Sequence, residues 1–307
     1  MSDTPTRGVP TPETDVLLRD VIAVLEELYP PTSAQSWDHV GLVTGDPEQP
    51  VRRIHLAVDP TLAVIEEARD AGADLLLTHH PLLMRGVHGL GTDTGKGAAV
   101  TALIVADLAL YAAHTNADVA DPGVCTALAA ACGLGETEPL TMEEGRPMGR
   151  LGRLPESVSL REFAAGLAAR LPGAPVGVRV AGPAEAPVTS VAVLGGAGDS
   201  LLEAARRGGA DVYVTSDLRH HPVLECREET RGGPPYLIDA GHFATEWLWL
   251  EEAARRLIAG LGARGAAVET YVSTIVTDPW TFVLGAQGPD VGDPGAHRWD
   301  DNEGGRE

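Results

Sequence analysis

Two segments of the chain, residues 64–78 and 201–215, carry the same sequence pattern without a gap. Seven of the fifteen aligned positions are identical, and most of the others pair one apolar residue with another. Each segment reads as a helix followed by an apolar strand, and another apolar strand precedes each of them, at 54–58 and 191–195. Two unrelated strand–helix–strand units would also share some residues, but we favour a duplication. The pattern predicts an α/β fold with two similar lobes around a pseudo-twofold axis.

The rest of the chain continues this alternation, which favours mixed, largely parallel sheets. We expect helices at 12–29, 61–73, 96–107, 126–133 and 159–171, and strands at 52–60, 74–78 and 108–115. Thr11, followed by Pro12, is the expected N-cap of the first helix, and Ser159 that of the last. We assign residues 1–125 plus 235–285 to a first lobe and 126–234 to a second lobe intertwined with it. Residues 286–307 are expected to be a disordered acidic tail.

Composition excludes several classes of protein. The 307 residues carry a formal net charge of −21, which argues against a protein that binds nucleic-acid backbones. Cys125, Cys132 and Cys226 lack the C-x-x-C spacing of zinc or redox sites, so we expect reduced thiols. The first residues do not resemble a signal peptide, and no run approaches the roughly 18 apolar residues of a membrane span. These features predict a soluble, cytoplasmic protein without a membrane partner.

Most of the ten histidines lie in four short motifs directly after predicted strands: His79–His80, His114, His220–His221 and His242. In open α/β sheets, ligand sites form at the carboxyl ends of strands, so we expect these motifs to converge. In "THHP" (78–81) the strand ends and Pro81 constrains the backbone, so the adjacent imidazoles can be aimed at two nearby points. The alternative is a polar loop with two exposed histidines.

Two further motifs add carboxylates. In "HTNAD" (114–118), His114 and Asp118 are four residues apart and suit one face of a helical turn. Alternatively, this motif only caps a helix, with Asp118 favouring the helix N-terminus. In "GHFATE" (241–246), His242 and Glu246 have the same spacing at the start of an apolar helix. Glu246 could bridge two metal ions with its two oxygens, or the motif is an ordinary helix start on the surface.

Together the motifs supply three imidazoles and two carboxylates, from His79, His80, Asp118, His242 and Glu246. Five ligands fit two divalent metal ions better than one, and nitrogen and oxygen donors without sulfur suit zinc, iron or manganese. We expect His80 to share one ion with Asp118, and His79 to share the other with His242. Glu246 would join the two ions. A two-metal site of this kind favours hydrolysis.

Other polar residues are expected around the metals. Where the first unit has His79–His80, the second has Ser216–Asp217, with His220 and His221 shortly after. We expect Asp217, His220 and His221 to line a substrate pocket, with a plain polar loop as the alternative. The Gly-rich "LGGAGDS" (194–200) could cradle a phosphate at a helix N-terminus or form a tight turn.

Six blocks of sequence occur in an order that resembles a known family. They are "SWDHVGLVTGDP" (36–47), "LLLTHHPLL" (75–83), "YAAHTNAD" (111–118), "GRLGRLP" (149–155), "DVYVTSDLRHH" (211–221) and "DAGHFATE" (239–246). The chain is similar to the Nif-three-like, YbgI-type family, whose members are often labelled GTP cyclohydrolase I type-2 homologues. The resemblance implies two intertwined α/β lobes, a dinuclear metal centre between them, and a toroidal homohexamer.

The resemblance also implies roles for single residues. The family's metal ligands fall on the same five residues that the motifs indicate, and His114 would lie beside the metals as a catalytic group. Trp37 and Asp38 match the family's Trp-Asp pair, which we assign to the substrate pocket. The next residue, His39, departs from the family's usual Asn.

Two hypotheses about function follow. The leading one is a metal-dependent hydrolase of the cyclohydrolase or phosphoesterase type, acting on a small anionic, nucleotide-like substrate. The other is a metal-binding or regulatory protein without catalysis. An open coordination position beside a pocket that excludes bulk water would favour the enzyme.

Overall fold

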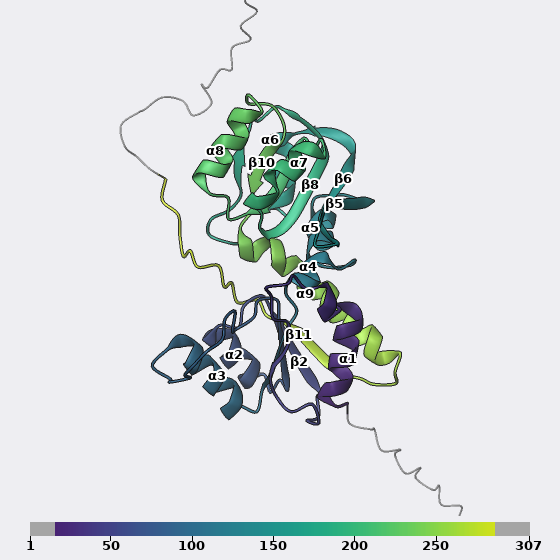
Figure 1. Ribbon diagram of the computed structural model, residues 1–307, viewed down its shortest axis with the longest axis vertical. Helices are drawn as coiled ribbons and strands as arrows, with labels where there is room; N and C mark the ends of the chain where they lie inside the picture. Colours follow the sequence, from purple (N-terminus) through teal and green to yellow (C-terminus); the bar gives the residue numbers. More distant parts are fainter. Residues whose placement is uncertain (1–15, 286–307) are drawn as a thin grey trace, which may run out of the picture.

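The computed structural model describes residues 16–285, and in it the chain forms two α/β lobes that lie one above the other (Figure 1). The first lobe contains a five-stranded sheet with the strand order β1-β4-β3-β2-β11, in which only β1 is antiparallel to its neighbour. Its strands are β1 (Gly41–Thr44), β2 (Arg53–Ala57), β3 (Leu75–Thr78), β4 (Ala109–Ala112) and β11 (Glu269–Val272). The predicted α/β fold with two lobes and mixed sheets is therefore confirmed.

The second lobe contains a six-stranded sheet with the order β5-β6-β8-β9-β10-β7. Strands β8, β9 and β10 are parallel, and the outer strands are antiparallel to their neighbours. The strands are β5 (Thr137–Glu143), β6 (Arg146–Ser159), β7 (Arg179–Ala181), β8 (Pro187–Ala197), β9 (Val212–Ser216) and β10 (Tyr236–Asp239).

Nine α-helices occur within residues 16–285, besides the short 3₁₀ turns η1 (Pro31–Ser33) and η2 (Asp199–Leu201). They are α1 (Leu18–Leu28), α2 (Leu62–Asp70), α3 (Gly95–Val105), α4 (Thr115–Val119), α5 (Val124–Ala131), α6 (Leu160–Ala168), α7 (Leu202–Arg207), α8 (His220–Glu229) and α9 (His242–Gly262). Ser159 caps α6 as predicted, because its hydroxyl accepts a hydrogen bond from the backbone N–H of Glu162, at 3.2 Å. Within the same range, no helix combines the length and the apolar composition needed to cross a membrane.

The repeat found in the sequence is also a repeat in space. Ile54 pairs with Leu75 between β2 and β3, and Val191 pairs with Val212 between β8 and β9, so both units have the same register. The correspondence extends beyond the aligned segments, because β1-β4-β3-β2 has the same order and strand directions as β7-β10-β9-β8. This agreement of topology and register supports the duplication.

Helix α9 joins the two lobes. Its buried residues Trp249 and Leu250 pack in the core of the first lobe, where the Trp249 ring meets Tyr29 of α1 edge-on at 5.3 Å between ring centroids. Leu248, on another side of the helix, packs against the core of the second lobe. The first turn of α9 is therefore held at the junction of the lobes, as Figure 1 shows.

Three sequence expectations need comment. The first helix begins at Leu18 rather than at Pro12, because Leu17 forms a β-bridge with Pro50 and Asp20 accepts the N–H of Leu17. Thr11, the expected cap, lies outside the described residues, as does the tail at 286–307. Strand β10 falls within the range assigned to the first lobe, whereas it pairs with β9 and β7 in the second sheet. The lobe boundaries as a whole stay a prediction.

Candidate metal centre

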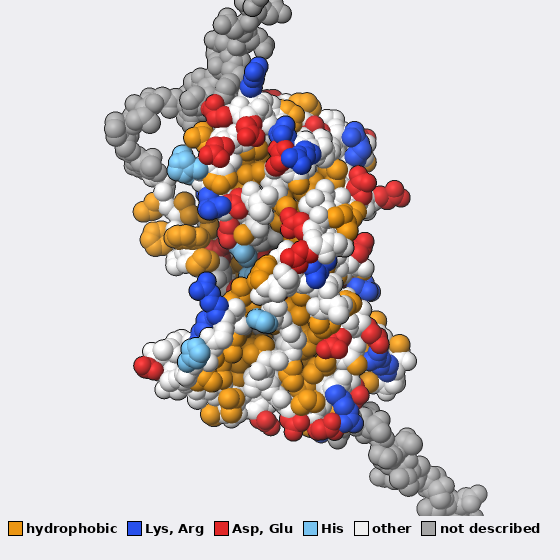
Figure 2. Space-filling model, in the orientation of Figure 1, with side chains coloured by type: hydrophobic (Ala, Val, Ile, Leu, Met, Phe, Trp, Pro, Cys, Tyr) orange, Lys and Arg blue, Asp and Glu red, His pale blue; other side chains and the backbone are white. Residues whose placement is uncertain are grey.

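The five predicted ligands come together at the junction of the lobes. His79 and His80 follow the end of β3, Asp118 lies in the short helix α4, and His242 and Glu246 lie in the first two turns of α9. Figure 2 shows a hollow between the lobes in which histidine and acidic side chains are visible. The structure therefore brings together side chains that are up to 167 positions apart in the chain, from His79 to Glu246.

Glu246 is the centre of the cluster. Its carboxylate is buried, and Oε1 lies 3.0 Å from Nε2 of His242 and 3.4 Å from Nε2 of His79. Its other oxygen, Oε2, lies 3.0 Å from Nε2 of His80. One carboxylate thus faces the Nε2 atoms of three imidazoles, which is the arrangement expected of a bridging ligand.

The pairing of the remaining ligands differs from the expectation. Nε2 of His80 lies 3.3 Å from Nε2 of His242, and Nε2 of His79 lies 3.5 Å from Oδ1 of Asp118. The expectation paired His80 with Asp118 and His79 with His242, which is wrong. The order of the strands explains the observed pairing, because β4 lies on one side of β3 and β2 lies on the other. His79 turns towards the end of β4, which leads into α4, and His80 turns towards the end of β2.

Each of the three imidazoles is held through its other nitrogen. Nδ1 of His79 lies 3.0 Å from the carbonyl oxygen of Ala113, after β4. Nδ1 of His80 lies 2.7 Å from Oδ1 of Asp59, after β2. Nδ1 of His242 lies 2.8 Å from Oδ2 of Asp217, after β9. Since all three partners accept hydrogen bonds, each Nδ1 donates to its partner, and Nε2 is the nitrogen that faces the cluster, as in metal-ligating histidines.

The charges of the cluster depend on one another. Burial raises the pKa of Glu246, but the facing imidazoles His80, His79 and His242 outweigh burial and hold this pKa well below its usual range. Burial lowers the pKa of His80, yet the charge of Glu246 and the hydrogen bond to Asp59 raise this pKa to about 10. For His242, burial is likewise outweighed by Glu246 and Asp217, which raise its pKa to about 11. Without a metal ion, protons on His80 and His242 balance the negative charge of Glu246, which a bound cation would otherwise neutralise.

Three ligand atoms support the interpretation as a metal site. Nε2 of His79 and Oδ1 of Asp118 are buried and have no hydrogen-bond partner among the described residues, and the buried Oε2 of Glu246 faces Nε2 of His80 at 3.0 Å. Burying polar atoms without partners is costly, so such atoms in one cluster need an explanation. Burial also raises the pKa of Asp118. A divalent cation bound by nitrogen and oxygen atoms would satisfy all three atoms, so the residues fit the group.

Gly196, in β8 of the second lobe, has no side chain, and Glu246 occupies the space where a Cβ atom would lie. It has a φ of +68°, and a Cβ atom at this position would lie 2.4 Å from Oε1 of Glu246 and 3.3 Å from Nε2 of His242. Its N–H donates to Oγ1 of Thr245 in α9, at 3.0 Å. In the Gly-rich stretch "LGGAGDS", the backbone therefore packs closely against the cluster and does not form an open phosphate cradle. The sequence suggested either a phosphate cradle or a tight turn at this stretch and did not indicate its contact with Glu246.

His114 lies beside the cluster. Its ring centroid is 5.2 Å from that of His79 and 5.6 Å from that of His80. One nitrogen of each of the three rings lies within 4.8 Å of the other two, which is close enough for the three to hold one metal ion. Nδ1 of His114 lies 3.0 Å from Oδ2 of Asp38, and Trp37 meets the ring of His114 edge-on at 5.9 Å.

Asp38 positions His114. Its Oδ2 also accepts hydrogen bonds from the backbone N–H and the hydroxyl of Thr115, at 3.1 and 2.6 Å. Burial raises the pKa of Asp38, but these contacts with His114 and Thr115 hold it well below its usual range. The role of Trp37 and Asp38 as substrate-pocket residues stays a prediction.

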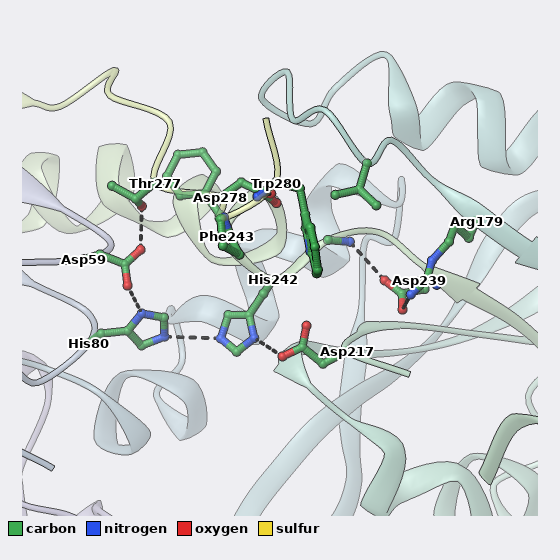
Figure 3. A pocket seen from close by; sticks show the side chains of 13 residues that line it. Asp59, His80, Arg179, Asp217, Asp239, His242, Phe243, Thr277, Asp278 and Trp280 are labelled. Atoms are coloured by element: carbon green, nitrogen blue, oxygen red, sulfur yellow. Dashed lines mark hydrogen bonds and ion pairs between the residues drawn. The ribbon is translucent and has the colours of Figure 1, made fainter. Parts of the chain in front are cut away.

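A cavity of about 280 Å³ opens beside the His80–His242 side of the cluster (Figure 3). Of the predicted pocket residues, Asp217 lines this cavity, while His220 lines a neighbouring one of about 390 Å³. His221 packs edge-on against His220, with 5.2 Å between ring centroids, and is not among the described residues that line either cavity.

Several lining residues were missed in the sequence: Asp59, Arg179, Asp239, Phe243, Thr277, Asp278 and Trp280. Asp59 carried a signal, since it lies at the carboxyl end of a predicted strand, 52–60, and the predicted ligands also lie near strand ends. The segment Thr277–Trp280 carried none, because it belongs to no periodic element and reaches the cavity only through the fold.

The sequence and the fold are similar to those of known proteins. The family model described as Duf34/NIF3 (NGG1p interacting factor 3) matches residues 16–279. A Streptomyces coelicolor protein called "GTP cyclohydrolase 1 type 2 homolog" is 48% identical over 269 residues, which cover 86% of this chain and 93% of the relative. Two solved structures are also similar. A Staphylococcus aureus hypothetical protein has a TM-score of 0.81 and 27% identity, covering 88% of this chain and 100% of its own. A Bacillus cereus protein related to NIF3 has a TM-score of 0.79 and 25% identity, with the same coverage.

Proposed function

Because this chain belongs to the Duf34/NIF3 family, we propose that it is a hydrolase that holds two divalent metal ions at the junction of its lobes. Its substrate would be a small anionic, nucleotide-like molecule. The name of the relatives, GTP cyclohydrolase 1 type 2 homolog, is consistent with this class of reaction. The observation that carries the proposal is the convergence of three imidazole Nε2 atoms on the buried carboxylate of Glu246.

Two groups of residues would hold the ions. His79, Asp118 and Glu246 form one group, and His80, His242 and Glu246 form the other. We propose zinc, iron or manganese, because the donors are nitrogen and oxygen atoms without sulfur. When bound, such a pair of ions would polarise the substrate and lower the pKa of a water molecule.

His114 would move the proton in this reaction. Asp38 accepts a hydrogen bond from Nδ1 of His114, which leaves Nε2 able to take up or release a proton beside the cluster. The side chain of His114 is 14% exposed, so it can exchange that proton with solvent. Asp38 acts through His114 as a positioning residue.

Replacement of Glu246 tests the metal site. Glu246→Ala should remove both ions, because the carboxylate lies between both groups of ligands. Elemental analysis of the purified protein measures the loss, and Glu251→Ala, an exposed change in the same helix, is the matched control and should retain both ions. Two ions per chain in Glu246→Ala would refute the bridging role.

Turnover is tested separately on metal-loaded protein. We expect hydrolysis of at least one member of a panel of nucleotides, cyclic phosphodiesters and amides. The His114→Ala variant should retain its metals and lose at least about 100-fold in kcat. Turnover by metal-loaded protein that is unaffected in Asp118→Ala and His114→Ala would contradict the mechanism. No turnover of any panel member would favour the alternative, a metal-binding or regulatory protein without catalysis.

We also propose that the chain assembles into a homohexamer, as the family resemblance implies. Ile104 and Val105, at the end of α3, are 62% and 81% exposed, and association would cover them. Light scattering should give the mass of six chains, and a monomer mass at micromolar concentration would contradict the assembly.

A further inference from the structure

We propose that the cavity beside His80 and His242 binds a flat aromatic ring carrying a carboxylate or phosphate group, and that Trp280 and Arg179 select this ligand. The inference rests on the proposed function, because it places the ligand next to the proposed metal ions. The cavity, of about 280 Å³, is the size of a one- or two-ring molecule. In Figure 3, Trp280 stands between the His80–His242 pair and the Arg179–Asp239 pair.

Trp280 lines the cavity although its side chain is not part of any hydrophobic core cluster of the described residues. It is 63% exposed, although Trp is a residue that proteins usually bury for the most part. Its backbone N–H donates to Oδ1 of Asp278 at 2.9 Å, which fixes the turn that presents the ring. A flat ligand ring stacked on the indole would cover this apolar surface.

The segment that carries Trp280 is tied to the metal cluster. Thr277 donates its hydroxyl proton to Oδ2 of Asp59, and Oδ1 of the same carboxylate holds Nδ1 of His80. The position of the indole is therefore set relative to a proposed metal ligand. Phe243, which is buried in the first turn of α9, supplies a second aromatic wall of the cavity. This arrangement favours a ring held at a defined distance from the cluster.

Arg179 gives the cavity its preference for an anion. It is the only Arg or Lys among the described residues that line the cavity. Nη2 of Arg179 donates to Oδ2 of Asp239, and the same Oδ2 accepts the N–H of Leu218 at 3.0 Å. Asp239 is thus held by backbone as well as by Arg179, and it fixes the guanidinium in place. A guanidinium has five donors, so Arg179 can also bind a carboxylate or phosphate.

The carboxylates of the cavity already have partners within the protein. Asp59 and Asp217 hold His80 and His242, Asp239 holds Arg179, and Asp278 holds the N–H of Trp280. A cationic ligand is therefore not needed to satisfy them. Arg179 and the indole are the groups that can still gain a contact, and together they describe an aromatic anion.

Binding of simple probes tests the inference. Zinc-loaded full-length protein is titrated by calorimetry with 2-naphthoate, phenylphosphonate, cyclohexanecarboxylate and 2-naphthamide. The two aromatic anions should bind at least about tenfold more tightly than the non-aromatic anion or the neutral amide. Trp280→Ala should weaken the aromatic anions about tenfold, and Arg179→Gln should remove the preference for 2-naphthoate over 2-naphthamide.

Two exposed residues provide matched controls. Phe282→Ala changes another aromatic side chain of the same segment, which is 71% exposed, and Arg161→Gln changes an exposed arginine outside the cavity. Neither control should alter probe binding. The inference is overturned if Trp280→Ala binds 2-naphthoate as tightly as the unaltered protein does. It is also overturned if Trp280→Ala instead lowers the mass measured by light scattering, because the indole would then contact a second copy of the chain.

The failure of this inference can be told apart from the failure of the proposed function. Zinc content is measured for every sample before titration. Protein that takes up no zinc contradicts the proposed metal site. Fully loaded protein that binds all four probes equally, or none of them below millimolar concentration, contradicts only the ligand class inferred from Trp280 and Arg179.

Discussion

At the scale of single residues, the cluster depends on which nitrogen of each imidazole faces Glu246. The acceptors at Nδ1 decide this, and they come from both lobes: Ala113 and Asp59 from the first, and Asp217 from the second. A buried carboxylate surrounded by three oriented Nε2 atoms leaves little freedom to rearrange. Small displacements of Glu246 should therefore have large effects on metal binding.

Gly196→Ala is expected to cause such a displacement. The new Cβ atom would lie 2.4 Å from Oε1 of Glu246, which is closer than nonbonded atoms can approach, so the carboxylate must move. We expect at least about a tenfold loss of zinc affinity, measured by competition with a chromogenic chelator.

Gly209→Ala is the matched control for this change. Gly209 has a φ of +69°, close to the +68° of Gly196, but a Cβ atom there would meet no other atom within 4 Å. Both variants should therefore lose about 1 kcal/mol of stability from backbone strain, while only Gly196→Ala should lose zinc. Equal zinc affinity in the two variants would show that Gly196 has no specific role.

The sequence predicts which residues gather here better than it predicts their contacts. His79, His80, Asp118, His242 and Glu246 could be named because each lies in a motif directly after a predicted strand. Which histidine faces which partner could not, because that depends on the order of β2, β3 and β4 in the sheet. Gly196 and Trp280 were not identified, because their contacts with the site exist only after the chain has folded.

At the scale of elements, the two repeats build the cluster from equivalent places. The end of β3 carries His79 and His80, and the end of β9 carries Ser216 and Asp217. Ala113 donates its N–H to Thr78, and Ala240 donates to Thr215, so α4 and α9 begin at equivalent positions after β4 and β10. The duplicated unit thus provides imidazoles in one lobe and, in the other, the carboxylate of Asp217 that orients His242.

Asp74 and Asp211 offer a test of how similar the repeats are in energy. Oδ2 of Asp74 accepts the N–H groups of Arg52 and Arg53, at 2.7 and 2.9 Å. Oδ2 of Asp211 accepts the N–H groups at the two equivalent positions of the second unit, both at 2.8 Å. We expect Asp74→Ala and Asp211→Ala each to lower the free energy of unfolding by about 1–3 kcal/mol, measured with urea.

The control for this pair is Asp70→Ala, because Asp70 is exposed and forms its ion pair with the neighbouring Arg69. It should change stability by less than about 0.5 kcal/mol. Costs that differ by more than 2 kcal/mol between Asp74→Ala and Asp211→Ala would show that the two units are alike in geometry but not in energy.

The elements themselves follow from local sequence, and their ends follow less well. Helix α6 begins where Ser159 predicts, because the cap and Glu162 form a local capping box. Helix α1 begins later than Thr11 and Pro12 suggest, because the β-bridge between Leu17 and Pro50 competes for the same backbone. Long-range pairing of this kind has no signature in a short stretch of sequence.

At the scale of the whole molecule, the cluster lies where both lobes meet, so its charge state should affect the stability of the entire chain. Without metal, the pKa values of His80 and His242 are about 10 and 11, against about 6.5 in an unfolded chain. Between about pH 6.5 and pH 10, the folded state therefore binds more protons than the unfolded state does. The contribution of both groups is complete below about pH 6.5 and is lost as pH rises towards 10 and 11.

We therefore expect chelator-treated protein to lose stability between pH 6.5 and pH 8.0, by about 3 kcal/mol for the two groups together, seen as a fall in the thermal midpoint. Zinc-loaded protein should show the opposite trend, because fewer protons compete with the metal as pH rises. In Glu246→Gln the charge that raises both histidine pKa values is absent, so its metal-free pH profile should be flatter. Metal-free protein whose midpoint is constant across this range would contradict the coupling of Glu246 to His80 and His242.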